Sequence, residues 1–161
     1  MYERNLARDI LNHFHMDTYE SIDLDRIAEA QGIEIRDLAD GDDDGASGWY
    51  REDDERPLIL INRNRSVAHQ RFTLAHELGH YFMKHGSRAR DTYRQIRLRE
   101  PEEVSANRFA AELLMPKEMV EEFLDQGLSA WEMARRFGVS DEAMGYRLHN
   151  LGYEYDQEYM F

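Results

Sequence analysis

Five residues, His-Glu-Leu-Gly-His at positions 76–80, constrain this chain more than any other segment of it. On an α-helix, residues i and i+4 lie above one another on the same face, so His76 and His80 can bind a single metal ion. Glu77 lies about one residue's rotation away, where its carboxylate can hold a metal-bound water and take its proton. This HExxH spacing is typical of zinc hydrolases, provided that the flanking sequence is helical and that a third ligand exists.

The sequence around the motif predicts a helix. Apolar side chains recur at helical spacing and suit one buried face: Leu74, Leu78 and Phe82. Ser66 is a suitable N-cap, and Gly86 stands where such a helix is expected to end. Gly79 lowers the helix propensity by about 1 kcal/mol relative to alanine. We therefore expect another backbone segment, or a substrate, to approach the helix closely at Gly79.

A second helix is predicted from Pro101 to Pro116, because proline suits a first helical turn and cannot continue a helix. A catalytic zinc usually has three protein ligands and one open position. The longer HExxHxxGxxH pattern is not present, since Met83 and Gly86 occupy its glycine and third histidine positions. The third ligand is therefore expected to be a carboxylate of the second helix.

One face of this second helix carries polar residues at its start and small or apolar residues further on: Glu103, Asn107, Ala110, Ala111 and Leu114. We predict that Glu103 is the third metal ligand; the alternative is an acid that only complements the helix dipole. Asn107, one turn later, is a candidate for orienting a ligand. Glu102 and Glu112 are expected to point elsewhere and to face solvent.

The two segments HELGHYFMKH and EEVSANRFAAELLMP, in this order, resemble the ImmA/IrrE family of metallopeptidases. The matching stretch runs roughly from Leu58 to Pro116. The resemblance implies zinc ligation by His76, His80 and Glu103, with Glu77 as the general base. It also implies a biological role, because members of the family typically cut a helix-turn-helix repressor of the phage type, often after DNA damage. Other members accompany toxin–antitoxin loci.

Residues 87–100 form a locally basic connector between the two predicted helices. A long connector beside an active site is often a functional lid, and the alternative is a mobile, solvated loop. A developing oxyanion usually needs a second donor besides the metal. His85, Tyr93 and Arg94 are the candidates for that donor or for substrate contacts, although His85 also suits a surface position at a helix end.

The remaining patterns predict an α+β fold with a small antiparallel sheet packed on the HExxH helix and the Glu103 helix. Two helices and three strands are expected in the first part of the chain, at 4–14, 23–31, 33–36, 48–51 and 58–62. An edge strand of this sheet could receive an extended substrate. Residues 128–152 read as helix, tight turn and helix, like a helix-turn-helix motif. We predict a metallopeptidase domain at 1–116 and a helical, helix-turn-helix-like extension packed on it at 117–161.

Composition limits the partners. A formal net charge of −13 disfavours direct nucleic-acid binding, because phosphate contacts require clustered Lys and Arg. Asp141 and Glu142 would repel phosphates at the start of the second helix of the helix-turn-helix-like segment. An acidic surface better suits a basic protein partner, such as a DNA-binding repressor. Because there is no cysteine, no signal-peptide pattern and no membrane-spanning run, we expect a cytoplasmic protein without disulfides.

The patterns and the resemblance together predict a zinc-dependent, site-specific endopeptidase with one Zn²⁺ per chain. The resemblance alone implies that its substrate is a helix-turn-helix transcriptional repressor, whose cleavage would derepress genes of a phage, a mobile element or a stress response. Mn²⁺ or Fe²⁺ could also occupy a site of two histidines and one carboxylate. The alternative is a catalytically silent protein-binding module, acting as a repressor partner or as a toxin–antitoxin component.

Overall fold

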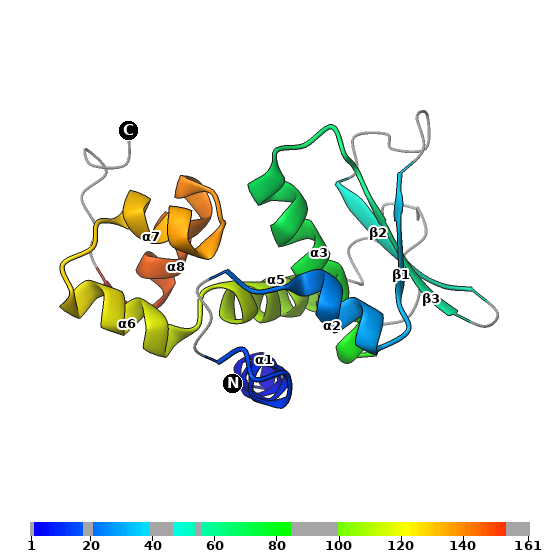
Figure 1. Ribbon diagram of the computed structural model, residues 1–161, viewed down its shortest axis with the longest axis horizontal. Helices are drawn as coiled ribbons and strands as arrows, with labels where there is room; N and C mark the ends of the chain where they lie inside the picture. Colours follow the sequence, from blue (N-terminus) through cyan, green and yellow to red (C-terminus); the bar gives the residue numbers. More distant parts are fainter. Residues whose placement is uncertain (1, 18–20, 39–46, 54–55, 85–99, 154–161) are drawn as a thin grey trace.

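The computed structural model describes residues 2–17, 21–38, 47–53, 56–84 and 100–153. Within these ranges the chain forms seven helices and one three-stranded sheet, which confirms the α+β class. In chain order the elements are α1 (Tyr2–His13), α2 (Leu24–Ala30), β1 (Glu34–Asp37), β2 (Gly48–Asp53), β3 (Arg56–Ile61), α3 (Val67–Phe82), α5 (Glu100–Leu114), α6 (Lys117–Asp125), α7 (Ala130–Phe137) and α8 (Asp141–Asn150). In Figure 1, α5 lies centrally, with the sheet on one side and α6, α7 and α8 on the other.

The sheet is mixed, with β3 at its centre in the order β1-β3-β2. β2 is antiparallel to β3, as expected, but β1 is parallel to β3, so the prediction of a purely antiparallel sheet was wrong in this detail. The reason is burial: Leu58, Ile59 and Ile61 of β3 are all buried, and a continuous apolar run suits a central strand. The chain therefore passes from β1 to the far edge and returns through the centre of the sheet.

Helix α3 carries the HExxH motif and begins as the sequence predicts. The Ser66 side chain accepts a hydrogen bond from the backbone N–H of His69 and caps the helix. Leu74 and Leu78 are buried along one face. The helix ends at Phe82 rather than near Gly86, because Lys84 adopts a left-handed backbone conformation with φ of 60°.

Helices α3 and α5 pack tightly against each other at Gly79. A Cβ atom on Gly79 would lie 3.0 Å from Cδ1 of Phe109 and 3.3 Å from Cα of Ala106. The expected close approach of a second backbone is therefore confirmed, and the approaching segment is α5. Ala110 and Leu114 are buried on α5, as predicted, and the apolar face is completed by Ala106, Phe109 and Leu113.

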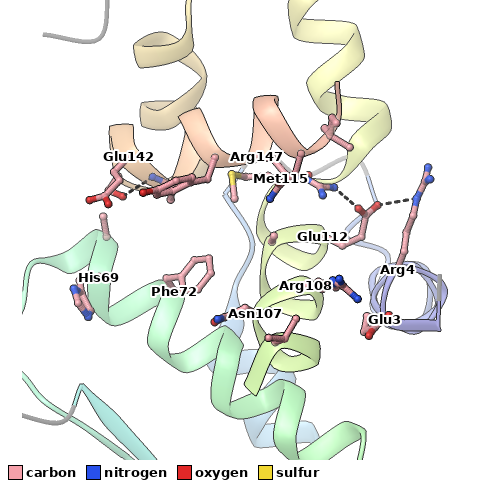
Figure 2. Close-up of a pocket in the computed structure, with 18 of the residues that line it drawn as sticks. Glu3, Arg4, His69, Phe72, Asn107, Arg108, Glu112, Met115, Glu142 and Arg147 are labelled. Carbon is pink, nitrogen blue, oxygen red and sulfur yellow. Dashed lines mark hydrogen bonds and ion pairs between the residues drawn. The ribbon is translucent and has the colours of Figure 1, made fainter. Parts of the chain in front are cut away.

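Glu112 of α5 is buried, so the prediction that it faces solvent was wrong. Arg147 of α8 pairs with one of its carboxylate oxygens, and Arg4 Nε of α1 lies 3.4 Å from the other. Arg147 also donates to the backbone carbonyl of Met115 at 3.0 Å. Glu112 is covered because α1 and α8, which come from the two ends of the chain, both pack against this side of α5 (Figure 2). Glu102 is half-buried.

The C-terminal helices have the predicted helix-turn-helix-like form, preceded by α6, which the sequence analysis did not single out. Gly138 ends α7 in a left-handed conformation with φ of 72°, and Ser140 caps α8 by accepting from the N–H of Ala143. Arg71 of α3 donates to the carbonyl of Phe137 at 3.4 Å, so the two parts of the chain are in contact. The division at residues 116 and 117 stays a prediction. None of the helices in the described ranges has the length and apolar character needed to cross a membrane.

Candidate metal centre

Three of the predicted site residues come together between α3 and α5. His76 and His80 project from α3, and Glu103 projects from the first turn of α5. His76 Nε2 donates to Glu103 Oε2 at 2.8 Å, and His80 Nε2 lies 3.2 Å from the other carboxylate oxygen. The two Nε2 atoms are 3.1 Å apart. One ligand atom from each residue thus lies within 4.8 Å of the others, which is the spacing that a single metal ion requires.

Asn107 fixes the orientation of His76 from one turn further along α5. The Nδ1–H of His76 donates to Asn107 Oδ1 at 2.7 Å. A histidine whose Nδ1 is engaged in this way presents Nε2 to a metal, in the correct tautomer and ring orientation. The structure therefore places Asn107 where the sequence analysis proposed it, in contact with a candidate ligand rather than with the metal position itself.

In this cluster, the histidine and the glutamate each shift the pKa of the other toward its charged form. Burial lowers the pKa of His76, but the hydrogen bond to Glu103 and the charges of Glu77 and Glu103 outweigh it, so the pKa lies above its usual value. Burial raises the pKa of Glu103, but the hydrogen bonds from His76 and His80 outweigh it and hold the pKa well below its usual range. Glu103 is therefore an ionised carboxylate, ready to act as a ligand, and a metal competes with a proton at His76.

Glu77 is buried and lies beside the cluster in a small cleft of about 310 Å³. The cleft is bounded by α3, by the start of α5, by Ser47 and by Gly48, the first residue of β2. A Cβ on Gly48 would collide with the Thr73 side chain and lie 2.8 Å from the Leu60 carbonyl oxygen. Only glycine lets the start of β2 lie this close to α3, and so the strand borders the cleft.

The structure adds residues to the site that the motif analysis missed. His69 and Phe72 border the cleft from α3, and His69 Nε2 lies 2.8 Å from the hydroxyl of Ser47. A signal existed, because His69 precedes His76 by seven residues, which is two helical turns along the same face. The predicted oxyanion candidates, His85, Tyr93 and Arg94, lie outside the described residues.

The donor set fits a divalent transition metal. Two imidazole nitrogens and one carboxylate oxygen match the three protein ligands of catalytic zinc sites, which keep one position open, and a buried glutamate lies nearby. The same donors also suit Mn²⁺ or Fe²⁺, so the geometry defines the site but not the element. The chain thus has the arrangement of proteins in which an HExxH helix lies beside a glutamate of a second helix, placed so that it could complete a metal site.

Comparison with known families gives the same result. Residues 28–149 match the IrrE N-terminal-like domain, and the chain belongs to this family. The resemblance inferred from the two motifs is thereby confirmed. The matched range contains the HExxH helix, Glu103 and most of the C-terminal helices.

Several curated proteins are similar over much of the chain. Metallopeptidase ImmA of Bacillus subtilis is 33% identical over 113 residues, which cover 66% of this chain and 65% of that protein. Radiation response metalloprotease IrrE of Deinococcus radiodurans is 35% identical over 130 residues, covering 76% of this chain and 38% of that protein. Uncharacterized immunity region protein 2 of Bacillus phage phi105 is 33% identical over 98 residues, covering 59% and 61%. The chain spans less than two thirds of the length of each of these relatives.

Proposed function

We propose that this chain is a zinc-dependent endopeptidase in which His76, His80 and Glu103 hold the metal and Glu77 is the general base. The observation that carries the proposal is the convergence of three ligand atoms beside the buried carboxylate of Glu77. Membership of the family supports it, as do the names of two relatives, a metallopeptidase and a metalloprotease.

The chain's own residues account for the proton transfers. When bound, a divalent ion at the three ligands would polarise the scissile carbonyl and make a water more acidic. Glu77 takes the proton of the attacking water and passes it to the leaving amine. Asn107 holds His76 in the tautomer that leaves Nε2 available, and Glu103 contributes a carboxylate that stays ionised.

The edge strand β2 is the proposed docking position for the substrate backbone next to the scissile bond. Among the described residues β2 pairs on one side only, with β3, and its first residue, Gly48, borders the cleft. An extended peptide that adds to this edge would bring its backbone to the metal position, since strand addition uses main-chain hydrogen bonds.

The proposed substrate is a DNA-binding repressor of the helix-turn-helix type. The net charge of −13 favours a basic partner, and the similarity to a phage immunity region protein supports a connection with repressor control. Direct DNA reading by α8 is disfavoured, because Asp141 and Glu142 lie in its first turn.

The test compares protein termini by mass spectrometry in cells that express the parent chain, Glu77→Gln or Glu122→Gln, with and without DNA damage. Glu122 lies on α6, exposed and remote from the cleft, so its variant controls for the loss of one carboxylate. We expect new termini, within a DNA-binding protein, with the parent and Glu122→Gln but not with Glu77→Gln. Metal content should be equal in all three purified proteins. Equal metal without any new terminus would favour the catalytically silent binding module.

A further inference from the structure

A second, larger groove runs from the metal centre toward the C-terminal helices. We call it the α3–α8 groove; it has a volume of about 1000 Å³, against about 310 Å³ for the metal cleft. Helix α5 forms its floor, and α3 and α8 form its walls (Figure 2). Its apolar lining includes Phe72, Val104, Ala111, Met115, Ala143 and Tyr146.

The groove is continuous with the metal centre. His69, Phe72 and Asn107 border both the metal cleft and the α3–α8 groove. Asn107 is hydrogen-bonded to the candidate ligand His76, so a single side chain separates one end of the groove from the metal position. Among the described residues, a chain bound in the groove can therefore continue past these shared side chains toward the candidate ligands.

The groove exposes apolar surface to solvent. Tyr146 is 61% exposed on α8, and Val104 is 42% exposed on α5, although both are large hydrophobic residues. Phe72, on the opposite wall, is half-buried. Exposed apolar groups that gather in one concave surface mark a binding site more often than a chance arrangement. Two aromatic side chains, Phe72 and Tyr146, would bury the most apolar surface against a bound partner.

Three charged residues that line the groove are paired with each other, and a fourth is hydrogen-bonded to a neighbouring serine. Glu112 pairs with Arg147 and Arg4, and Glu3 accepts a hydrogen bond from Ser105 at 2.7 Å. The charges of Glu112, Arg147 and Arg4 are therefore already compensated, and the apolar lining is available for contact with a partner, next to Arg108 and Glu142. These pairs also tie α8 to α5, so the groove is formed before a partner arrives and less ordering entropy is lost on binding.

We infer that the α3–α8 groove binds the substrate polypeptide on one side of the scissile bond, as an extended segment that places an apolar side chain between Phe72 and Tyr146. This inference rests on the proposed function. The metal cleft accommodates the scissile bond and its immediate neighbours, and the larger groove holds the residues beyond them. Cleavage specificity is then set partly by α8, which lies outside the HExxH and Glu103 helices.

The test uses the cut site found in cells by comparing the parent chain with Glu77→Gln. Two synthetic peptides are made: a long one with ten residues on each side of the scissile bond and a short one with two. The zinc-loaded parent, Tyr146→Ala, Tyr146→Phe and Tyr2→Ala are assayed on both. Tyr2 is the matched control, because it is 62% exposed and does not line the groove.

For Tyr146→Ala we expect kcat/KM on the long peptide to fall about tenfold, mainly through KM, because an aromatic anchor is lost. Activity on the short peptide should stay within about twofold of the parent, since hydrolysis itself is untouched. Tyr146→Phe should restore cleavage of the long peptide, and Tyr2→Ala should leave both rates unchanged. Circular dichroism checks that each variant is folded.

The failures of the two proposals are distinguishable. If the parent chain generates no termini that Glu77→Gln lacks, the proposed function fails and this inference fails with it. If the parent cuts the long peptide and Tyr146→Ala cuts it equally well, only the assignment of the groove is overturned. Faster cleavage by Tyr146→Ala would mean that the groove holds a segment of this chain or a second copy, which also overturns the assignment to substrate.

Discussion

Helix α5 carries two glutamates that each contact two partner side chains. One of them belongs to the candidate metal site, and the other stabilises the packing of helices around α5. Glu103 contacts two histidines of one helix, and its side chain is 42% exposed. Glu112 contacts arginines of two different helices, and its side chain is 3% exposed. The two residues are nine positions apart, about two and a half turns, so they point to opposite sides of α5.

The partners decide what each carboxylate can do. An imidazole nitrogen can bind a metal ion in place of a proton, so the two histidines beside Glu103 can accept a metal. Guanidinium groups keep their charge, so Glu112 stays locked between Arg4 and Arg147 and holds α1 and α8 against α5. One carboxylate is available for chemistry, and the other fixes the wall of the α3–α8 groove.

The largest expected effect is the loss of metal binding in Glu103→Gln. A neutral amide replaces the ionised ligand, so metal affinity should fall by more than about 100-fold and cleavage should be lost. The metal-free protein should lose less stability than Glu112→Gln does, because the Glu103 side chain is partly exposed and solvent screens its interaction with the two histidines. Metal content after dialysis, measured by inductively coupled plasma mass spectrometry, checks the first point. Glu102→Gln, on the neighbouring residue, is the control; full metal retention by Glu103→Gln would contradict the ligand assignment.

For Glu112→Gln we expect the opposite result, a loss of stability without a loss of metal binding. Removing one partner of a buried pair leaves the Arg147 charge uncompensated, which should cost roughly 3–5 kcal/mol of the free energy of unfolding. Metal stoichiometry should not change. Urea denaturation of the metal-free protein gives the stability. Glu112→Leu combined with Arg147→Met should be less damaging than Glu112→Leu alone, and an additive loss would argue against coupling between the two residues.

A smaller effect on the metal site is expected for Asn107→Ala. His76 loses the acceptor that fixes its ring, so metal affinity should fall about 10- to 100-fold while both histidines remain. Competition with a chromogenic chelator measures the affinity. Asn107→Asp keeps an acceptor at the same place and should lose less. Unchanged affinity in Asn107→Ala would show that α3 alone orients His76.

The same contrast explains what the sequence could predict. The HExxH helix, its Ser66 cap and the close approach at Gly79 follow from local spacing and propensity, and all three are present. The positions of His76, Glu77 and His80 relative to each other are also local, since they share one helix. Glu103 required a second helix, but its position near the start of that helix was a usable signal.

The features that sequence could not predict depend on distant segments. The burial of Glu112 arises from Arg4 and Arg147, which are 108 and 35 residues away along the chain. No pattern within α5 reports that α1 and α8 cover this side. The parallel pairing of β1 has the same origin, because it depends on which strand occupies the centre of the sheet. The α3–α8 groove exists only once α8 is placed beside α3.

The smallest expected effect concerns the packing contact between α3 and α5. Gly79→Ala gains about 1 kcal/mol in helix propensity, but its Cβ would lie 3.0 Å from the Phe109 ring and 3.3 Å from the Ala106 Cα. Overpacking of a close helix contact costs about 1–3 kcal/mol, so we expect a net loss of roughly 1 kcal/mol in the free energy of unfolding.

Gly79→Val should be clearly worse than Gly79→Ala, because a larger side chain must separate the two helices. Both should also weaken metal binding, since Gly79 adjoins His80 and any separation moves Glu103 away from the two histidines. Urea denaturation and the chelator competition measure the two quantities on the same samples. A more stable Gly79→Ala with unchanged metal affinity would mean that the contact between α3 and α5 can adjust to a larger side chain. It would also mean that the metal site does not depend on the close approach of α5.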